Sequence, residues 1–443
     1  MQFNSIPFIF EFLPAFLLVY FCIRPELRRF TLVLFSLIFY GLSAGGRLWW
    51  LALLAGVTLY TYFVCRELAR GRSGAVLSVG LLSLGAILTF FKLWQGGTRL
   101  PAGMSFYMFQ SAAYMIDVYR GRLKFSSSLL GFSEQLLLFP KLLSGPLMDP
   151  VQLQAGSENP PRRFANVRSG LLTLILGLSL KVLLANRLGG LFGQLYVTGF
   201  QNVSTAYAWM ALISWAMQLY FDFYGYSLMA IGLGRIIGYE LPDNFREPYA
   251  SRSVSEFYRR WHITLGAWFR EYLYIPLGGN RKGTLRTILN LAVVWLFTGL
   301  WHGVGGNYLL WAGMLFFLVV NERLWLGRLL KKTRVLCHVY TVFAILLTWV
   351  PFAVGDWNSM LLFAGRLFGR CAGQYNPADY LIWGRDFLPL LLAGVVLATP
   401  LPRKLWQRLK DRPVADVICF CLFWVVVFYI ATSAQDPFLY FSF

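Results

Sequence analysis

Charged residues are scarce in this sequence. Asp, Glu, Lys and Arg make up 14% of its 443 residues, whereas a typical soluble domain carries about 25%. Hydrophobic residues account for 57%, and stretches without any charged side chain recur at residues 30–46, 48–65, 73–91, 188–221, 287–321, 335–355, 387–402 and 417–435. Several of these approach the ~20 residues that a helix needs to cross a bilayer. The composition therefore excludes a soluble domain and predicts an integral membrane protein with roughly ten crossings.

Acidic residues are the rarer charged class, with 20 against 40 basic residues and a net charge of +20. The basic residues cluster between apolar runs, around residues 24–29, 66–72, 120–124, 323–334 and 403–412. This pattern follows the positive-inside rule, so we assign the excess charge to cytoplasmic loops and not to nucleic-acid binding. No basic cluster precedes the first apolar run, which predicts a retained first crossing, with both termini outside the cytoplasm.

Motifs of several other protein classes are also absent. The six cysteines include no CxxC pair, and the chain has no HExxH sequence and no P-loop ending in GK[ST]. These absences argue against a disulfide framework, a zinc site and a P-loop nucleotide site. No internal repeat of fixed period is visible, which argues against a transporter built from duplicated halves.

The sequence changes character near residue 100. We interpret residues 1–95 as N-terminal transmembrane helices, residues 101–321 as a catalytic core and residues 322–443 as C-terminal transmembrane helices of one membrane domain. Glycine, proline and polar residues interrupt the apolar sequence at 101–107 and 139–146. Helix breaks at membrane depth are tolerated only where protein buries them or where they line a cavity. We therefore expect the core to hold the functional site.

His302 is the most informative single residue. It lies in the uncharged run 287–321, and an ionisable side chain in a membrane segment is by default a candidate for function. The run is too long for one crossing, and glycines at 299, 303, 305 and 306 interrupt it. Either it forms a hairpin with arms of ~22 Å and His302 deep in the bilayer, or the arms cross separately and His302 lies nearer the far face. A structural histidine bound to a carbonyl is the alternative; we favour proton transfer.

A second candidate region, residues 253–280, combines helical spacing with a histidine. Trp261, Leu265, Trp268 and Tyr272 share one stripe, and His262, Gly266, Phe269 and Arg270 share another. An interfacial helix with its aromatic stripe in lipid would account for this pattern. However, Arg259 and Arg260 place positive charge beside His262, and Gly266 leaves space one turn further on. That combination favours binding of an anionic donor, such as a phosphate-bearing carrier.

Asp222 is an isolated carboxylate in the aromatic sequence YFDFYGY at 220–226. Two interpretations are open. It orients a histidine, as the carboxylate of a catalytic triad does, or it caps the helix that follows. His338 follows a basic loop, and we assign it no role.

At these residues the chain resembles the membrane-bound O-acyltransferase family, and within it the alginate O-acetyltransferase branch. The motifs follow one another in order: LPAGMSFY at 100–107, YMIDVYR at 114–120, FPKLLSGP at 139–146, YFDFYGYS at 220–227, LPDNF at 241–245, RRWHITL at 259–265, YLYIPLGGN at 272–280, GLWHG at 299–303 and NER at 321–323. The resemblance implies an all-α polytopic membrane protein, with a ring of about ten transmembrane helices and re-entrant helices around a central tunnel.

The resemblance also implies roles for particular residues. His302 and His262 match the two characteristic histidines of the family and would be catalytic. The residues that would bind donor or substrate are Arg259, Arg260, Trp261, Asn244, Asp222 and Trp301. The donor would be a cytoplasmic acyl thioester, acetyl-CoA or an acyl carrier, with no bound cofactor and no metal site.

The same resemblance implies an enzyme of the bacterial cytoplasmic (inner) membrane. It would O-acetylate an extracytoplasmic polysaccharide, as in alginate or other exopolysaccharide biosynthesis, through a periplasmic SGNH-type partner. A related branch transfers D-alanine to teichoic acid, but it lacks the YIPLGGN ending at 274–280, which favours acetyl transfer. A transporter or flippase of a lipid-linked sugar is an alternative from a different class, since it too would hold ionisable groups in the membrane.

Overall fold

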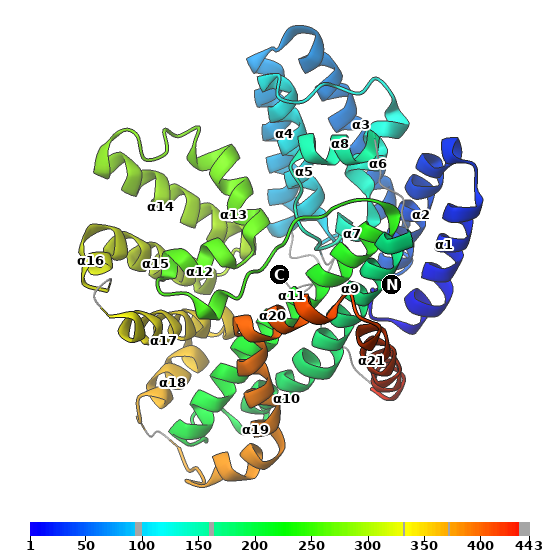
Figure 1. Cartoon of the computed structure of the whole chain (residues 1–443). Coiled ribbons are helices and arrows are strands. Elements are labelled where there is room, and N and C mark those ends of the chain that lie inside the picture. Colours follow the sequence, from blue (N-terminus) through cyan, green and yellow to red (C-terminus); the bar gives the residue numbers. More distant parts are fainter. Residues whose placement is uncertain (94–99, 159–163, 331–332, 371–372, 434–443) are drawn as a thin grey trace. The chain divides into compact units, whose positions relative to one another are not determined.

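The computed structural model of the chain is built from helices (Figure 1). The structure describes residues 1–93, 100–158, 164–330, 333–370 and 373–433, and within these ranges no β-strand forms. This confirms the predicted all-α class. The chain divides into two compact units: unit 1 consists of Met1–Leu178, Tyr226–Asp243 and Phe423–Thr432, and unit 2 is formed by Ser179–Gly225 and Asn244–Leu422.

Unit 1 is built mainly from the N-terminal helices. These are α1 (Leu13–Cys22), α2 (Arg28–Ser43), α3 (Leu48–Gly71), α4 (Gly74–Leu93), α5 (Met104–Arg120), α6 (Leu129–Leu137), α7 (Phe139–Leu142), α8 (Pro150–Glu158) and α9 (Phe164–Ser179), with the π-helical turn η1 (Phe8–Phe12) and the 3₁₀ turn η2 (Pro25–Leu27).

Unit 2 holds most of the later helices. These are α10 (Asn186–Thr198), α11 (Thr205–Ile237), α12 (Val254–Arg260), α13 (Ile263–Phe269), α14 (Gly283–His302), α15 (Gly306–Asn321), α16 (Gly327–Leu330), α17 (Arg334–Ala353), α18 (Trp357–Leu367), α19 (Asp379–Leu397), α20 (Pro400–Leu409) and α21 (Pro413–Thr432). Shorter π or 3₁₀ turns are η3 (Leu180–Ala185), η4 (Pro248–Ala250), η5 (Arg270–Tyr274) and η6 (Glu322–Leu326). Residues 226–237 of α11 and 423–432 of α21 belong to unit 1.

Eight helical segments in the described part of the chain are long and apolar enough to cross a membrane. They are Leu48–Gly71, Gly74–Leu93, Asn166–Thr198, Gly283–His302, Gly306–Leu329, Arg334–Ala353, Asp379–Leu397 and Pro413–Thr432. The protein is therefore integral to a membrane. The ring of about ten helices and the placement of the termini stay predictions.

The two overlong uncharged runs break, as predicted. The first is divided between the end of α10 at Thr198 and the start of α11 at Thr205, and the second at the turn between α14 and α15. With 20 residues, α14 is ~30 Å long, and the segment Gly306–Leu329 has 24 residues. Each arm is long enough to cross by itself, which favours separate crossings over a short hairpin with His302 at its deep tip.

In unit 1 the two interrupted segments of the sequence meet. Gly103 has a φ of +68°, and a Cβ at this position would lie 2.4 Å from the carbonyl oxygen of Leu142, so the contact requires glycine. Every residue from 131 to 148 is buried. The interruption at 139–146 therefore lies inside protein, as expected for a broken helix in a membrane protein.

In unit 2 a group of helices surrounds the start of α12. Here α14 packs along α15, α15 packs on α17, and α12 contacts both α15 and α17 (Figure 1). The carboxylate of Glu322, at the start of η6, accepts hydrogen bonds from the backbone N–H of Val254 (2.6 Å) and of Ser255 (3.0 Å). The Ser255 hydroxyl donates to the same carboxylate at 2.7 Å. A carboxylate here satisfies N–H groups that a helix leaves unpaired at its N-terminus, so Glu322 fixes the start of the helix that leads to His262.

Replacing Glu322 by Gln should destabilise the protein. The amide keeps one acceptor oxygen but turns an N–H toward groups that themselves donate, at an expected cost of about 1–3 kcal/mol. We expect a lower melting temperature in thermal unfolding of the detergent-purified protein. Glu67→Gln is the control, because Glu67 belongs to an exposed pair with Arg70 at 2.7 Å, and such pairs contribute at most about 1 kcal/mol. Equal melting temperatures for Glu322→Gln and wild type would contradict the anchoring role.

Candidate active site

The backbone turns at His262, between α12 and α13. Helix α12 begins after Ser253, whose hydroxyl accepts from the N–H of Glu256 at 3.0 Å, and it ends at Arg260. His262 then adopts left-handed dihedral angles, φ 47° and ψ 53°, before α13 starts. A single helix through residues 253–280 is therefore ruled out. A left-handed non-glycine residue costs on the order of 1–3 kcal/mol and persists only where its surroundings hold it.

Asn244 is the residue that holds this turn. Its backbone carbonyl accepts from the N–H of Ile263 at 2.9 Å. Its side-chain Oδ1 lies 2.9 Å from Thr264 Oγ1, 3.3 Å from the Thr264 nitrogen and 3.1 Å from His262 Nδ1. Because Asn244 and His262 are both buried, water does not compete for these hydrogen bonds.

His302 is the last residue of α14 and lies at the corner where the chain turns into α15. Its ring contacts those of Trp311 and Phe352, with centroid separations of 4.9 Å and 5.0 Å. The predicted break at Gly299 is wrong, since Gly299 lies inside α14. A Cβ there would come within 2.9 Å of the Ala312 Cβ, so glycine allows α14 and α15 to approach closely.

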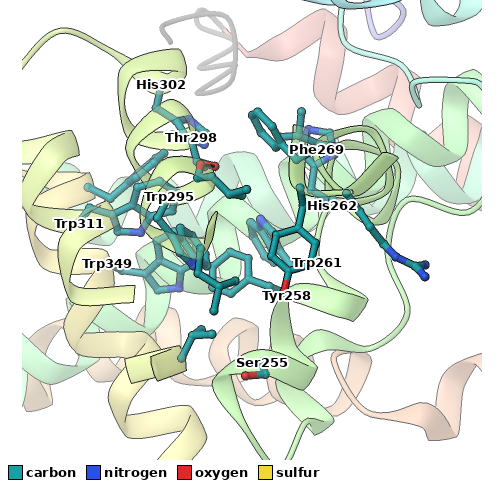
Figure 2. A pocket seen from close by; sticks show the side chains of 18 of the residues that line it. Ser255, Tyr258, Trp261, His262, Phe269, Trp295, Thr298, His302, Trp311 and Trp349 are labelled. Atoms are coloured by element: carbon teal, nitrogen blue, oxygen red, sulfur yellow. Dashed lines mark hydrogen bonds between the residues drawn. The ribbon is translucent and has the colours of Figure 1, made fainter. Parts of the chain in front are cut away.

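Both histidines line one cavity of 280 Å³ in unit 2. Figure 2 shows His302 and Thr298 on one wall, and His262, Trp261 and Phe269 on the other. The remaining lining is mainly apolar and aromatic, with side chains that include Tyr258, Trp295, Trp311, Trp349 and Phe352. A small apolar cavity with a few convergent polar groups is typical of a ligand site.

Of four predicted site residues near the turn at His262, one lines this cavity and three do not. Trp261 lines the cavity and is only 8% exposed, so this member of the aromatic stripe does not face lipid. Arg259 is exposed and Arg260 pairs with Glu256 at 2.6 Å, and neither lines the cavity. Trp301 is not part of the lining either, although its ring lies 6.2 Å from that of His262.

Asp222 forms a buried ion pair. Its Oδ1 lies 2.7 Å from Lys181 Nζ, and the Lys181 ammonium also donates to Asn186 at 2.7 Å. Asp222 sits in the interior of the 33-residue helix α11, so the interpretation that it caps a following helix is wrong. Asp222 does not line the cavity, but its neighbour Phe223 does, with its ring 4.7 Å from that of His262. The Lys181 pairing gives the carboxylate a structural function, and any role in donor binding remains a prediction.

Several lining residues were not proposed from the sequence. Arg270 lines the cavity and is exposed, which places a cation at the edge of the cavity. The stripe of His262, Gly266, Phe269 and Arg270 contained the necessary signal, since all four line the cavity. Trp349 and Phe352 come from α17, beyond the predicted core boundary at residue 321, and no local sequence pattern connects them to the histidines.

The two imidazoles differ in their surroundings. Burial lowers the pKa of His262 to about 3, so this ring is neutral at physiological pH. His302 is half-buried, at the end of its helix. A neutral imidazole accepts a proton or a hydrogen bond, and the apolar walls limit access of water. The arrangement suits proton transfer between small groups held in the cavity.

Comparison with known proteins gives matches to membrane acyltransferases. The sequence matches the membrane-bound O-acyltransferase family over residues 75–350. It is 32% identical to a probable alginate O-acetylase of Pseudomonas putida over all of both chains. It is also 32% identical to a peptidoglycan O-acetyltransferase of Helicobacter pylori, over 81% of this chain and 78% of that protein. A teichoic acid D-alanyltransferase of Streptococcus thermophilus is 27% identical over 52% of this chain and 58% of that protein.

The match spans more than half of the chain and contains both histidines, Asn244 and most of the cavity. The enzyme class expected from the sequence is confirmed by it. The chain belongs to the membrane-bound O-acyltransferase family.

Proposed function

We propose that this protein takes an acetyl group from a cytoplasmic thioester, acetyl-CoA, for O-acetylation of an extracytoplasmic polysaccharide. The observation that carries the proposal is the placement of His262 and His302 on facing walls of one apolar cavity (Figure 2). Two histidines in a cavity of 280 Å³ provide proton-transfer groups next to space for a thioester and a hydroxyl.

In the proposed reaction His302 is the general base. The hydroxyl oxygen of the acceptor attacks the thioester carbonyl carbon while its proton passes to His302. The C–S bond then breaks, and the sulfur leaves as a thiol after taking that proton. His262 orients the donor from the facing wall. The aromatic side chains around His302 keep bulk water from hydrolysing the thioester.

The donor's charge is accommodated at the edge of the cavity. The phosphates of acetyl-CoA cannot enter an apolar cavity without a large desolvation cost. Arg270 lines the cavity and remains exposed, so its guanidinium can bind a phosphate while the thioester lies between the histidines. This moves the proposed phosphate contact from Arg259 and Arg260 to Arg270.

The relatives support acetyl transfer to a glycan. The alginate and peptidoglycan O-acetyl relatives align with all or about four fifths of the chain, whereas the D-alanyl relative aligns with about half. We infer that the protein lies in the bacterial inner membrane and passes the acetyl group to the polysaccharide through a periplasmic SGNH-type partner. Family membership favours this chemistry over transport of a lipid-linked sugar.

The first test replaces His302 by Ala. Transfer of radiolabelled acetyl from acetyl-CoA, measured in membranes that contain the glycan acceptor and its partner protein, should fall by about 10²–10⁴-fold, the usual contribution of a general base. The amount of protein in the membrane should not change.

His338→Gln is the matched control for this test. His338 lies on α17, where its Nδ1 is 3.1 Å from the Ser251 carbonyl oxygen, and it does not line the cavity. This variant should transfer acetyl at close to the wild-type rate. Normal transfer by His302→Ala would refute the general-base assignment.

A second test concerns Arg270. Arg270→Ala should raise the KM for acetyl-CoA roughly 10-fold with little effect on kcat, because one charge-assisted hydrogen bond contributes about 1.5 kcal/mol or more. Arg328→Ala, which removes an exposed arginine outside the cavity, is the control. Higher salt should weaken donor binding in the wild type more than in Arg270→Ala. An unchanged KM in Arg270→Ala would place the phosphate contact elsewhere.

A further inference from the structure

We infer that Asn244 is a positioning residue that fixes His262 in the tautomer with the proton on Nδ1, so that Nε2 carries the lone pair. The inference rests on the proposed function for its consequence in catalysis, but its geometric basis is independent of that function. It assigns Asn244, expected from the sequence to bind donor or substrate, a different task.

The orientation of the Asn244 amide follows from its neighbours. The backbone N–H of Thr264 can only donate, and it lies 3.3 Å from the side-chain oxygen of Asn244. The Thr264 hydroxyl lies 2.9 Å from the same oxygen. A flipped amide would point its NH₂ group at the backbone N–H and lose that hydrogen bond. The atom facing this turn is therefore the carbonyl oxygen.

The tautomer of His262 follows in turn. The same Asn244 oxygen lies 3.1 Å from His262 Nδ1, and a carbonyl oxygen is an acceptor only. Nδ1 must therefore carry a hydrogen. In a neutral imidazole the other nitrogen, Nε2, then holds the lone pair. The ring is held further by edge-to-face contact with Phe223, at a centroid separation of 4.7 Å.

The backbone geometry supports the same conclusion. His262 adopts φ 47°, and the segment that carries Asn244 binds the turn on both sides. The N–H of Arg246 donates to the carbonyl of Arg260 at 2.9 Å, and the N–H of Ile263 donates to the carbonyl of Asn244 at 2.9 Å. The strained turn places the imidazole next to the Asn244 oxygen, as expected where strain serves a site.

The consequence concerns what His262 can bind. With Nδ1–H bound to Asn244, the ring offers the cavity an acceptor. It cannot donate a hydrogen bond to the thioester oxygen and so is not an oxyanion-stabilising group. It can accept from an amide N–H of the pantetheine arm of the donor. In the proposed reaction His262 therefore orients by accepting a hydrogen bond.

The chain's histidine content permits a direct test. The protein has three histidines. We would label the full chain with [¹⁵N]histidine, reconstitute it in lipid and record solid-state ¹⁵N spectra from pH 5 to 8, assigning His262 by the signal that His262→Gln removes. The expected result is a protonated Nδ1 and a bare Nε2 across this range. A proton on Nε2 with a bare Nδ1 would overturn the inference.

Variants of Asn244 separate positioning from simple support of the turn. Asn244→Leu removes the acceptor, and we expect His262 to shift to the Nε2–H tautomer and acetyl transfer to fall by roughly 10–100-fold. Thr264→Val removes a different donor to the same oxygen and should leave the tautomer unchanged. A purely structural role would leave the His262 tautomer unchanged in Asn244→Leu.

Asn244→Asp keeps an acceptor oxygen and covers the case in which Asn244→Leu does not fold. Its carboxylate stabilises the imidazolium, which raises the pKa of His262 above the low value that burial gives it in the wild type. Transfer should persist near neutrality, where His262 is still neutral. Protonation of His262, followed in ¹⁵N spectra extended below pH 5, should occur at a higher pH than in the wild type. The other titratable groups that line the cavity are Tyr258, Arg270, Tyr274 and His302, and Asp222 with Lys181 flanks Phe223. Protonation of His262 at the same pH in Asn244→Asp as in the wild type would contradict the inference.

These outcomes distinguish two failures. If the wild-type protein transfers no acetyl, the proposed function fails, and the ¹⁵N spectra still decide the tautomer. If acetyl is transferred but the proton of His262 is on Nε2, the tautomer inference alone fails.

Discussion

The left-handed turn at His262 is the constraint on which the rest of the candidate site depends. It ends α12 and starts α13 in a new direction, so that both helices contribute to one wall of the cavity. Trp261 comes from the end of α12 and Phe269 from the end of α13. A turn of this kind is unfavourable by itself and needs external support. Asn244 supplies that support through its backbone and its side chain, and Glu322 fixes the other end of α12.

The opposite wall depends on close packing of two apolar helices. Without a side chain at Gly299, α14 and α15 approach closely enough to bring Trp311 against the His302 ring. Phe352 of α17 closes the same side. In lipid, such helices associate through packing and small residues rather than through the hydrophobic effect. A bulky residue at Gly299 would therefore separate the helices and move His302 together with its aromatic neighbours.

The uncharged runs of the sequence predicted most of the membrane helices. The segment Asn166–Thr198 is the exception, and the reason is physical. The segment Asn166–Thr198 is apolar and long enough to cross, yet Lys181 in its middle interrupts the run. Asp222 interrupts α11 in the same way. The two charges neutralise each other at 2.7 Å in the folded protein, which a scan of single segments cannot detect. Burial of such a pair is tolerated only when both members are present, because an unpaired buried charge costs several kcal/mol, about 3–5. The free-energy cost of burying either charge therefore depends on the other charge and cannot be assigned to one helix alone.

The sequence predicted the two histidines that line the candidate cavity, but it did not predict which arginine lines it. An ionisable residue in an uncharged segment identified His302, and helical spacing placed His262, Gly266, Phe269 and Arg270 together. Adjacency in sequence suggested Arg259 and Arg260, but the turn at His262 redirects the chain, and Arg260 pairs with Glu256 instead. Arg270, which lines the cavity, lies about two helical turns after His262 in the sequence. A phosphate-bearing donor needs its cation outside the apolar walls and its thioester inside them. For the proposed donor, Arg270 meets that requirement because it lines the cavity and is still exposed, whereas Arg259 and Arg260 do not line the cavity.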